Sequence, residues 1–482
     1  MMQKNILPMK HTLLLTLVLF STVCCSFIYS QNQAIAYSYD LMEVSFIAEI
    51  NSGYAVVNTD YNEPYTRPHY IADTGESKPV AYISGSFPKL EVVIATDCDS
   101  VFVRGMNEYM TFTMPQGSPA AITGPEGRVS IAVTAIDSFE EGRIKFYENF
   151  IIQWEISKDG EMWMPLGESN NTLYVIVGGS SFFNHHFHTT YDIACRAANN
   201  LRGVTHDEIK NVVDVIFDTA FKKDNNDNFP ELRRISDGTT LTYYGVHPSD
   251  VDEYFCPFNA ALFLQTGDGR CGALTDFLIE CIEVLGMDSD ILEVYQLGVL
   301  PFPVDSSING VIISDSGGVE LTTTSKTNLV NQYENQFNED FDMMTNLVIL
   351  DYLFLVKNWN VANPGEFIPL YTGECSLRSQ EIAQSAFGEP GIVGQGNVEN
   401  PRSIFLNHVV AAYDNVILDP SYGTRYLDAA NNSFRNTTQY ENDSFDVATG
   451  AFIKREISAN TCEYYYWVEK LNDIEEQDFF TY

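Results

Sequence analysis

The chain has 482 residues, of which 45% are apolar and 13% aromatic, a composition typical of a globular rather than a disordered protein. Its 27 basic and 65 acidic residues give a formal net charge of −38. Such a charge repels nucleic acids and anionic membrane surfaces, so we expect neither as a partner.

The N-terminus is typical of an export signal. Two lysines precede the apolar run Leu13–Val23, which is too short to span a bilayer and fits the hydrophobic part of a signal peptide. We therefore expect residues 1–30 to be removed, and the protein to be secreted, periplasmic or at the cell surface, with no transmembrane span. Lipid anchoring at Cys24 or Cys25 stays open, although the small residue usual before a lipidated cysteine is absent.

Seven cysteines follow that segment, namely Cys98, Cys195, Cys256, Cys271, Cys281, Cys375 and Cys462. In an oxidising compartment an odd number fits up to three disulfides plus one free thiol, and it fits seven unpaired thiols equally well. No two of them have CxxC spacing, which argues against a structural zinc site. We expect no metal and no other cofactor.

Residues 31–178 are predicted to form an all-β domain. The segment 128–137, RVSIAVTAID, alternates apolar and small polar residues, and Asp159-Gly160 marks a hairpin with Trp154 and Trp163 facing each other across it. Many short strands with Gly, Pro and Asp turns predict a β-sandwich of immunoglobulin type, although the Cys-Trp-Cys framework is absent. The expected role is a spacer or a module that binds a surface ligand.

Helical patterns begin in the next domain, residues 179–430. Thr205 and Glu208 have capping-box spacing before an apolar helical pattern. A second helix is predicted within GDGRCGALTDFLIECIEVLGM, starting at Cys271 and ending near Gly286. Strands are expected in DGTTLTYYG and ILEVYQLGVL.

The remaining segments are less regular. The apolar run 345–359 fits a helix or a buried strand equally well. Residues 394–397 form a glycine-rich loop that either borders the site or is an ordinary connection. Two strands joined at residues 413–415 are predicted within SIFLNHVVAAYDNVILDPSYG, and residues 431–482 form a C-terminal extension.

Three residues have the pattern of a cysteine nucleophile and its partners. A helix N-terminus favours the thiolate of Cys271, a histidine such as His408 takes and returns the proton, and an acceptor such as Asp419 orients the histidine. A hairpin turn between the last two would put both on one sheet face. Each residue alone is also typical of a plain structural role: a buried cysteine, a core histidine and an aspartate in a turn.

The two stretches around Cys271 and His408 resemble the transglutaminase-like superfamily. The resemblance implies a papain-like α+β core over about residues 189–426, with Cys271 as nucleophile, His408 as base and Asp419 as orienting acceptor. The sequence departs from the family at Thr275, where Ala or Ser is common, and at Val409 and Val410, where an aromatic residue often follows the histidine. The long gap between cysteine and histidine implies an insertion around residues 300–390.

Other polar residues are weaker candidates. Gln265 lies six residues before Cys271, where papain-like enzymes place an oxyanion-hole glutamine. The alternative is that Gln265 is a polar loop residue. The backbone N–H of Cys271 is the safer oxyanion donor. His185, His186 and His188 suggest a metal site less strongly than a linker. Asp224, Asn226 and Asn228 resemble a calcium loop, but Ile235 stands where the loop needs Glu.

The sequence as a whole predicts an exported cysteine enzyme acting on amide or peptide bonds of a protein or peptide substrate. Hydrolysis by a peptidase or amidase is favoured over acyl transfer of the protein-glutamine type, because water is abundant and no calcium site is convincing. The alternative is a catalytically inactive transglutaminase-like protein with a binding or surface-assembly role. A purely structural module that handles cell-wall or polysaccharide material is a third possibility.

Overall fold

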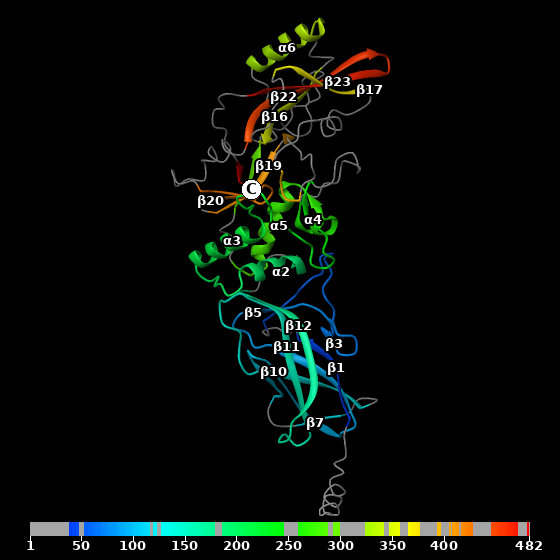
Figure 1. Cartoon of the computed structure of the whole chain (residues 1–482), viewed down its shortest axis with the longest axis vertical. Helices are drawn as coiled ribbons and strands as arrows, with labels where there is room; N and C mark the ends of the chain where they lie inside the picture. The colour runs from blue at the N-terminus through cyan, green and yellow to red at the C-terminus, as the bar shows by residue number, and fades with distance from the viewer. Residues whose placement is uncertain are drawn as a thin grey trace, which may run out of the picture.

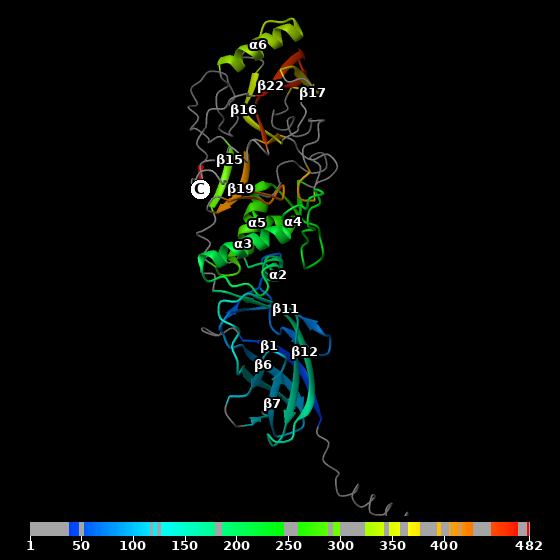
Figure 2. The ribbon, with the colours of Figure 1, turned by 60° about the vertical axis from the view of Figure 1, so that its left-hand side comes forward.

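The computed structural model of the protein describes residues 38–47, 53–115, 119–122, 127–178, 186–244, 259–287, 293–298, 323–341, 347–356, 365–375, 393–396, 404–405, 407–413, 416–427, 445–470 and 480–481. Among the described residues the fold is mostly β, with more strand than helix. Figures 1 and 2 show three regions stacked along the long axis: an N-terminal β region, a helical region and a C-terminal sheet. The expected export segment, Cys24, Cys25 and Cys256 lie outside the described residues.

The N-terminal β region contains the all-β domain predicted from the sequence. Its strands are β1 (Tyr39–Phe46), β2 (Tyr54–Ala55), β3 (Tyr70–Ile71), β4 (Glu76–Ser77), β5 (Val80–Ile83), β6 (Lys89–Thr96), β7 (Ser100–Met106), β8 (Thr111–Thr113), β9 (Ala120–Ala121), β10 (Arg128–Ala135), β11 (Lys145–Ser157) and β12 (Met164–Ile176). Hydrogen bonds join them in the order β2-β5-β12-β11-β7-β8-β10-β6-β1-β3-β4, with β9 on β7. The described strands thus form one large curled sheet, and β1 lies against β12 although they are distant in that order.

The hairpin predicted at Asp159-Gly160 joins β11 to β12. Gly160 has a φ of +79°, a conformation that costs glycine little. Trp154 and Trp163 do not face each other as predicted. Trp154 is buried in the core, whereas Trp163 lies under the guanidinium of Arg104, 4.1 Å from it. The reason is that Trp163 precedes the first residue of β12 and stands outside the strand alternation.

The helical region comprises α2 (His188–Ala197), α3 (His206–Ala220), α4 (Ala260–Thr266) and α5 (Cys271–Glu283), with the short strands β13 (Thr242–Tyr243) and β14 (Asp268–Gly269). The predicted capping box is present: the Thr205 side chain accepts from the Glu208 N–H, and the Glu208 carboxylate accepts from the Thr205 N–H. Helix α5 begins at the predicted residue, Cys271, and buries its apolar face. The strand predicted in DGTTLTYYG is shorter than expected.

An antiparallel sheet covers α5. It has the order β21-β20-β19-β15-β24, from β15 (Glu293–Gly298), β19 (Asn407–Tyr413), β20 (Val416–Asp419), β21 (Thr424–Leu427) and β24 (Phe480–Thr481). Helix α5 packs against β19, the strand that carries His408. The two strands predicted on either side of residues 413–415 are β19 and β20.

The C-terminal sheet combines two distant parts of the chain. Its order is β17-β23-β22-β16-β18, from β16 (Leu347–Val356), β17 (Phe367–Glu374), β18 (Ile404–Phe405), β22 (Phe445–Ser458) and β23 (Thr461–Lys470), and α6 (Thr323–Phe337) packs on it. Within the run at 345–359, which was ambiguous in the sequence, Leu347–Val356 therefore form a strand. A disulfide joins Cys375 to Cys462. The predicted insertion and the predicted C-terminal extension thus meet in one sheet.

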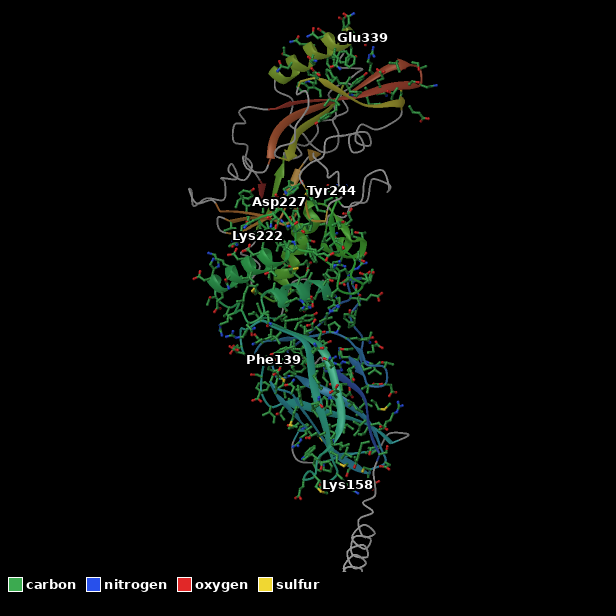
Figure 3. All side chains as sticks on the ribbon, in the orientation of Figure 1. Phe139, Lys158, Lys222, Asp227, Tyr244 and Glu339 are labelled. Atoms are coloured by element: carbon green, nitrogen blue, oxygen red, sulfur yellow. A yellow bond between two sulfur atoms is a disulfide. The ribbon has the colours of Figure 1, made fainter. Side chains whose placement is uncertain are left out.

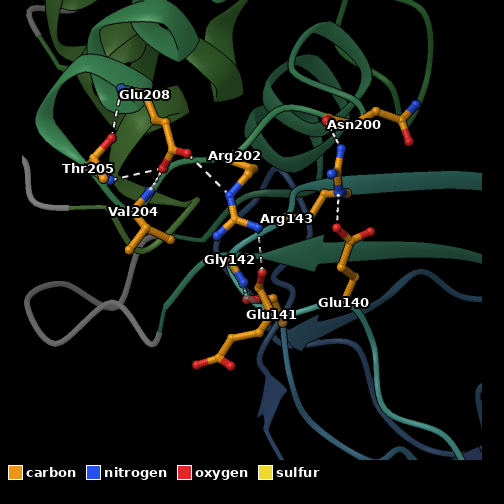
Figure 4. A network of polar contacts seen from close by, with 10 residues as sticks. Glu140, Glu141, Gly142, Arg143, Asn200, Arg202, Val204, Thr205 and Glu208 are labelled. Atoms are coloured by element: carbon orange, nitrogen blue, oxygen red, sulfur yellow. Dashed lines mark hydrogen bonds and ion pairs between the residues drawn. The ribbon is translucent and has the colours of Figure 1, made fainter.

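The β region and the helical region are packed together. One hydrophobic core continues from β12 into α2, α3 and α5. Polar contacts between the two regions add to it (Figure 4): Arg143 donates to the Asn200 carbonyl over 2.6 Å, and Arg202 donates to the Glu141 carbonyl over 3.5 Å. After α5, Gly286 lies so close to the backbone of Gly178 that a Cβ would overlap the Gly178 carbonyl. No described helix is both long enough and apolar enough to cross a membrane.

Candidate active site

Cys271 lies at the N-terminus of α5, after a tight turn from α4. Gly267 ends α4 with a φ of +82°, which favours glycine. Arg270, the N-cap of α5, makes no side-chain capping hydrogen bond, so no capping side chain occupies the first N–H groups of the helix. These groups and the helix dipole favour a negative charge on the Cys271 sulfur.

Two opposing effects act on the Cys271 thiol. Burial raises its pKa. The hydrogen bond and positive charge of His408, with the backbone N–H groups of Val409 and Gly272, lower it by more, so the pKa of the thiol lies below the ordinary value. Cys281 on the same helix shows the contrast, because burial and a neighbouring carboxylate hold the pKa of its thiol well above the ordinary value. The surroundings of Cys271 favour its thiolate, whereas those of Cys281 favour the neutral thiol.

His408 and Asp419 are brought together by the β19–β20 hairpin. The register pairs Ala411 with Leu418, which puts His408 and Asp419 on the same sheet face, as the sequence predicted. His408 Nε2 lies 2.9 Å from Asp419 Oδ2, and both side chains are fully buried. The second carboxylate oxygen, Oδ1, accepts from the N–H groups of Ser421 and Tyr422 over 3.0 and 3.2 Å. The backbone therefore holds the Asp419 carboxylate in the position from which it orients the imidazole.

The imidazole of His408 is held in its charged form. Burial lowers its pKa, but the charge of Asp419 and the hydrogen bonds to Asp419 and Cys271 outweigh burial and raise the pKa to about 10. Because Nε2 engages Asp419, Nδ1 is the ring nitrogen available to the Cys271 sulfur. The His408 imidazole thus lies between the Cys271 sulfur on one side and the Asp419 carboxyl on the other.

Two buried tyrosines also line the thiol, and sequence reasoning missed them. The rings of Tyr243 and Tyr422 meet edge to face, with their centroids 5.4 Å apart. The Tyr422 ring lies 5.6 Å from the His408 ring. Burial holds the pKa of both hydroxyls well above the ordinary value, so both stay neutral beside the thiolate. Tyr422 lies three residues after Asp419, and that proximity is the only signal the sequence offered.

The glycine-rich loop before the histidine strand borders the site. Gln395 is 1% exposed; its carbonyl accepts from the Tyr243 N–H over 2.6 Å, and its N–H donates to the Ser421 carbonyl over 2.9 Å. Its side-chain amide donates to the Phe221 carbonyl. Residues 393–396 therefore tie together the two segments that carry the tyrosines. Tyr244, next to Tyr243, lies at the end of the helical region nearest the C-terminal sheet (Figure 3).

Gln265, the candidate side-chain oxyanion donor, lies on the helix before Cys271. It occupies the last turn of α4, its side chain is exposed, and its carbonyl accepts from Arg234. An oxyanion donor works best in a site shielded from water. The structure thus gives the Gln265 assignment no support, and the N–H of Cys271 at the uncapped start of α5 stays the stronger candidate.

The histidine cluster belongs to the junction between the two regions. His188 begins α2, and its Nδ1 forms a 3.1 Å hydrogen bond with the Tyr65 hydroxyl. The same ring is largely buried, which lowers its pKa. His186 is part of the described chain and His185 is not. Among the described residues, no group of three His, Cys, Asp or Glu side chains could hold a metal ion.

The calcium-like loop is closed by its own backbone. Asp224 Oδ1 accepts from the N–H groups of Asn226 and Asn228 over 2.7 and 2.9 Å. Ile235, at the position where a calcium loop requires Glu, is 41% exposed. The loop is therefore explained as a turn stabilised by Asp224.

No known protein family matches the sequence of the chain, and neither does any curated protein. The site itself must therefore indicate the function. It offers a thiolate, an imidazolium that can give and take a proton, a carboxylate that orients it, and N–H donors at a helix N-terminus. This set can form and break an acyl–sulfur bond.

Proposed function

We propose that the protein is an exported cysteine enzyme that cleaves amide or peptide bonds, with Cys271 as nucleophile, His408 as acid and base, and Asp419 as the group that orients His408. The observation that carries the proposal is the buried contact of His408 with Asp419 at 2.9 Å, on the strand against which the Cys271 helix packs. A charged chain of this kind is expensive to bury, so a purely structural role would be better served by apolar residues.

The reaction follows from these atoms. The Cys271 thiolate attacks the carbonyl carbon of the amide; the new C–S bond forms as the π electrons move to the oxygen, which the N–H of Cys271 stabilises. The C–N bond then breaks, and His408 gives its proton to the leaving amine. Water, losing a proton to His408, attacks the thioester, and C–S cleavage regenerates the thiolate. One amide and one water yield a carboxylic acid and an amine.

The same arrangement supports a transglutaminase-like core around the site. Helix α5 packs on an antiparallel sheet whose strands β19 and β20 carry His408 and Asp419, which is the placement the resemblance implies. We infer a papain-like α+β core on this basis. For the N-terminal β region, the curled all-β sheet supports an immunoglobulin-like module with a spacer or ligand-binding role.

One observation favours the inactive alternative. Cys271 is 4% exposed, and Tyr243 and Tyr422 pack beside it, so a substrate reaches the sulfur only if neighbouring groups move. A transglutaminase-like protein kept for binding or surface assembly would tolerate such a covered site. Against it stands the lowered pKa of Cys271, which a protein without cysteine chemistry has no need to maintain.

The test is to incubate the protein with a peptide library, with and without a primary amine, and to identify the products by mass spectrometry. We expect new carboxyl termini from hydrolysis, and amide adducts if the acyl group passes to an amine. Cys271→Ala should abolish both products. The matched control is Cys281→Ala, a buried cysteine on the same helix, which should keep turnover.

Two results would decide against the enzyme. Turnover that persists in Cys271→Ala would remove the nucleophile from the mechanism. A wild-type protein that turns over no peptide and whose Cys271 is not alkylated by iodoacetamide faster than Cys281 would favour the binding role.

A further inference from the structure

The residue that follows His408 is bound to α5 through its backbone. Thr275 Oγ1 donates a 2.9 Å hydrogen bond to the carbonyl of Val409, the residue that directly follows His408. Thr275 is 1% exposed and lies one helical turn after Cys271, on the same face of α5. The Val409 carbonyl therefore ties the strand that carries His408 to the helix that carries Cys271.

The hairpin explains why this carbonyl is available. Continuing the register beyond the pair Ala411–Leu418 places Pro420 opposite Val409, and the ladder alternation points the Val409 N–H and C=O toward that side. Proline has no N–H and cannot donate to the Val409 carbonyl. The ladder between β19 and β20 ends at the pair Ala411–Leu418, and the Thr275 hydroxyl supplies the donor that the Val409 carbonyl lacks there.

We propose that Thr275 is a positioning residue of the candidate active site, whose hydroxyl holds the Val409 carbonyl and so fixes the Cys271 sulfur at the distance from His408 that proton sharing requires. The proposal rests on the proposed function, because it assigns a role within the Cys271–His408 pair. It also gives a physical reason for Thr275, where the family resemblance leads one to expect Ala or Ser. Serine would keep the hydrogen bond, and alanine would lose it.

The experiment is the rate of iodoacetamide alkylation of Cys271 in the full chain across pH, mapped by peptide mass spectrometry. Thr275→Val keeps the shape of the side chain and removes the donor. We expect its alkylation profile to move to higher pH by about one unit, which is about tenfold slower labelling on the acid side. Thr275→Ser should restore the wild-type profile. If Thr275→Val does not fold, Thr275→Ala removes the same donor with better helix propensity.

The matched control is Thr190→Val. Thr190 is a buried threonine on α2 whose hydroxyl donates a 2.8 Å hydrogen bond to the Phe187 carbonyl. Thr190→Val should lower thermal stability about as much as Thr275→Val does, and it should leave the pH profile of Cys271 alkylation unchanged. A wild-type profile in Thr275→Val, or an equal shift in Thr190→Val, would overturn the role of Thr275. A profile that does not move even in His408→Ala would refute the Cys271–His408 pair itself, and with it both proposals.

Discussion

Two histidines are buried in two regions of this protein, and their surroundings keep one neutral and the other positively charged. His69 in the β region is 1% exposed and His408 in the helical region is 0% exposed. Burial, together with the cations Arg67 and Lys78, lowers the pKa of His69 to about 4. At His408 the charge of Asp419 and the contact with Cys271 overcome the same burial and raise the pKa to about 10.

The hydrogen bonds show the same division. His69 Nδ1 accepts from the Phe46 N–H over 3.1 Å, so its Nε2 carries the proton and donates to the Tyr54 hydroxyl at 3.2 Å. A neutral ring with these partners has a structural role. His408 binds a carboxylate and a thiol, and both favour the imidazolium. Burial therefore does not mark a site; the charges that face the buried group do.

The largest expected effect follows from removing His408. In His408→Ala the Cys271 thiolate loses its main stabilising partner while burial still opposes the charge, so alkylation by iodoacetamide near pH 6 should slow by roughly 100-fold. Peptide mapping by mass spectrometry measures it. His69→Asn, which removes the other buried histidine, should leave the alkylation rate of Cys271 unchanged. An equal decrease of this rate in both variants would show that it reflects the stability of the fold and not the contact with His408.

The second prediction concerns stability against pH in the β region. A histidine with a lowered folded pKa binds fewer protons folded than unfolded, so stability falls as the pH drops from 6.5 toward 4. The loss should be on the order of 2 kcal/mol. Denaturant unfolding at a series of pH values should show this slope in the wild type and not in His69→Asn. His408 has the opposite sign: its contribution is full below pH 6.5 and is lost as the pH rises through about 10.

A smaller effect is expected at Asp419. Asp419→Asn keeps a side chain that can accept from the backbone of Ser421 and Tyr422 but removes the charge that raises the pKa of His408. The imidazolium is then less favoured, and alkylation of Cys271 below neutral pH should slow by about tenfold. A rate equal to that of the wild type would mean that the hydrogen bond alone, without the charge, maintains the pair.

The smallest expected effect tests Glu280, a half-buried carboxyl whose pKa is shifted by burial and two neighbouring carboxylates and by no cation. Burial, with the charges of Asp276 and Glu283, raises the pKa of Glu280 to about 8. Its folded form holds a proton that the unfolded form loses, so stability falls as the pH rises from 4.5 toward 8. Glu280→Gln should raise the melting temperature above pH 8 by about 2–4 °C per kcal/mol recovered. No gain above pH 8 would show that water already solvates this carboxylate.

The sequence predicted the local parts of the site, because they depend on short-range periodicity. The glycine turn and the apolar 3.6-residue pattern predicted the helix that starts at Cys271, and the two-residue alternation of the hairpin predicted that His408 and Asp419 share a face. The capping box at Thr205 was found the same way. The catalytic roles of these residues stay predictions.

Only the tertiary structure decided what surrounds that centre. Tyr243, Gln395 and Thr275 reach it from segments whose own patterns carry no trace of the contact, since 134 residues separate Thr275 from Val409. The same holds for the C-terminal sheet, in which the predicted insertion and extension pair, and for Gln265, whose side chain is exposed on α4. Periodicity specifies which face of an element is buried, but packing among distant segments decides which groups lie across that face. The sequence therefore determined the helix that carries Cys271, and the tertiary structure determined the groups that hold this residue in place.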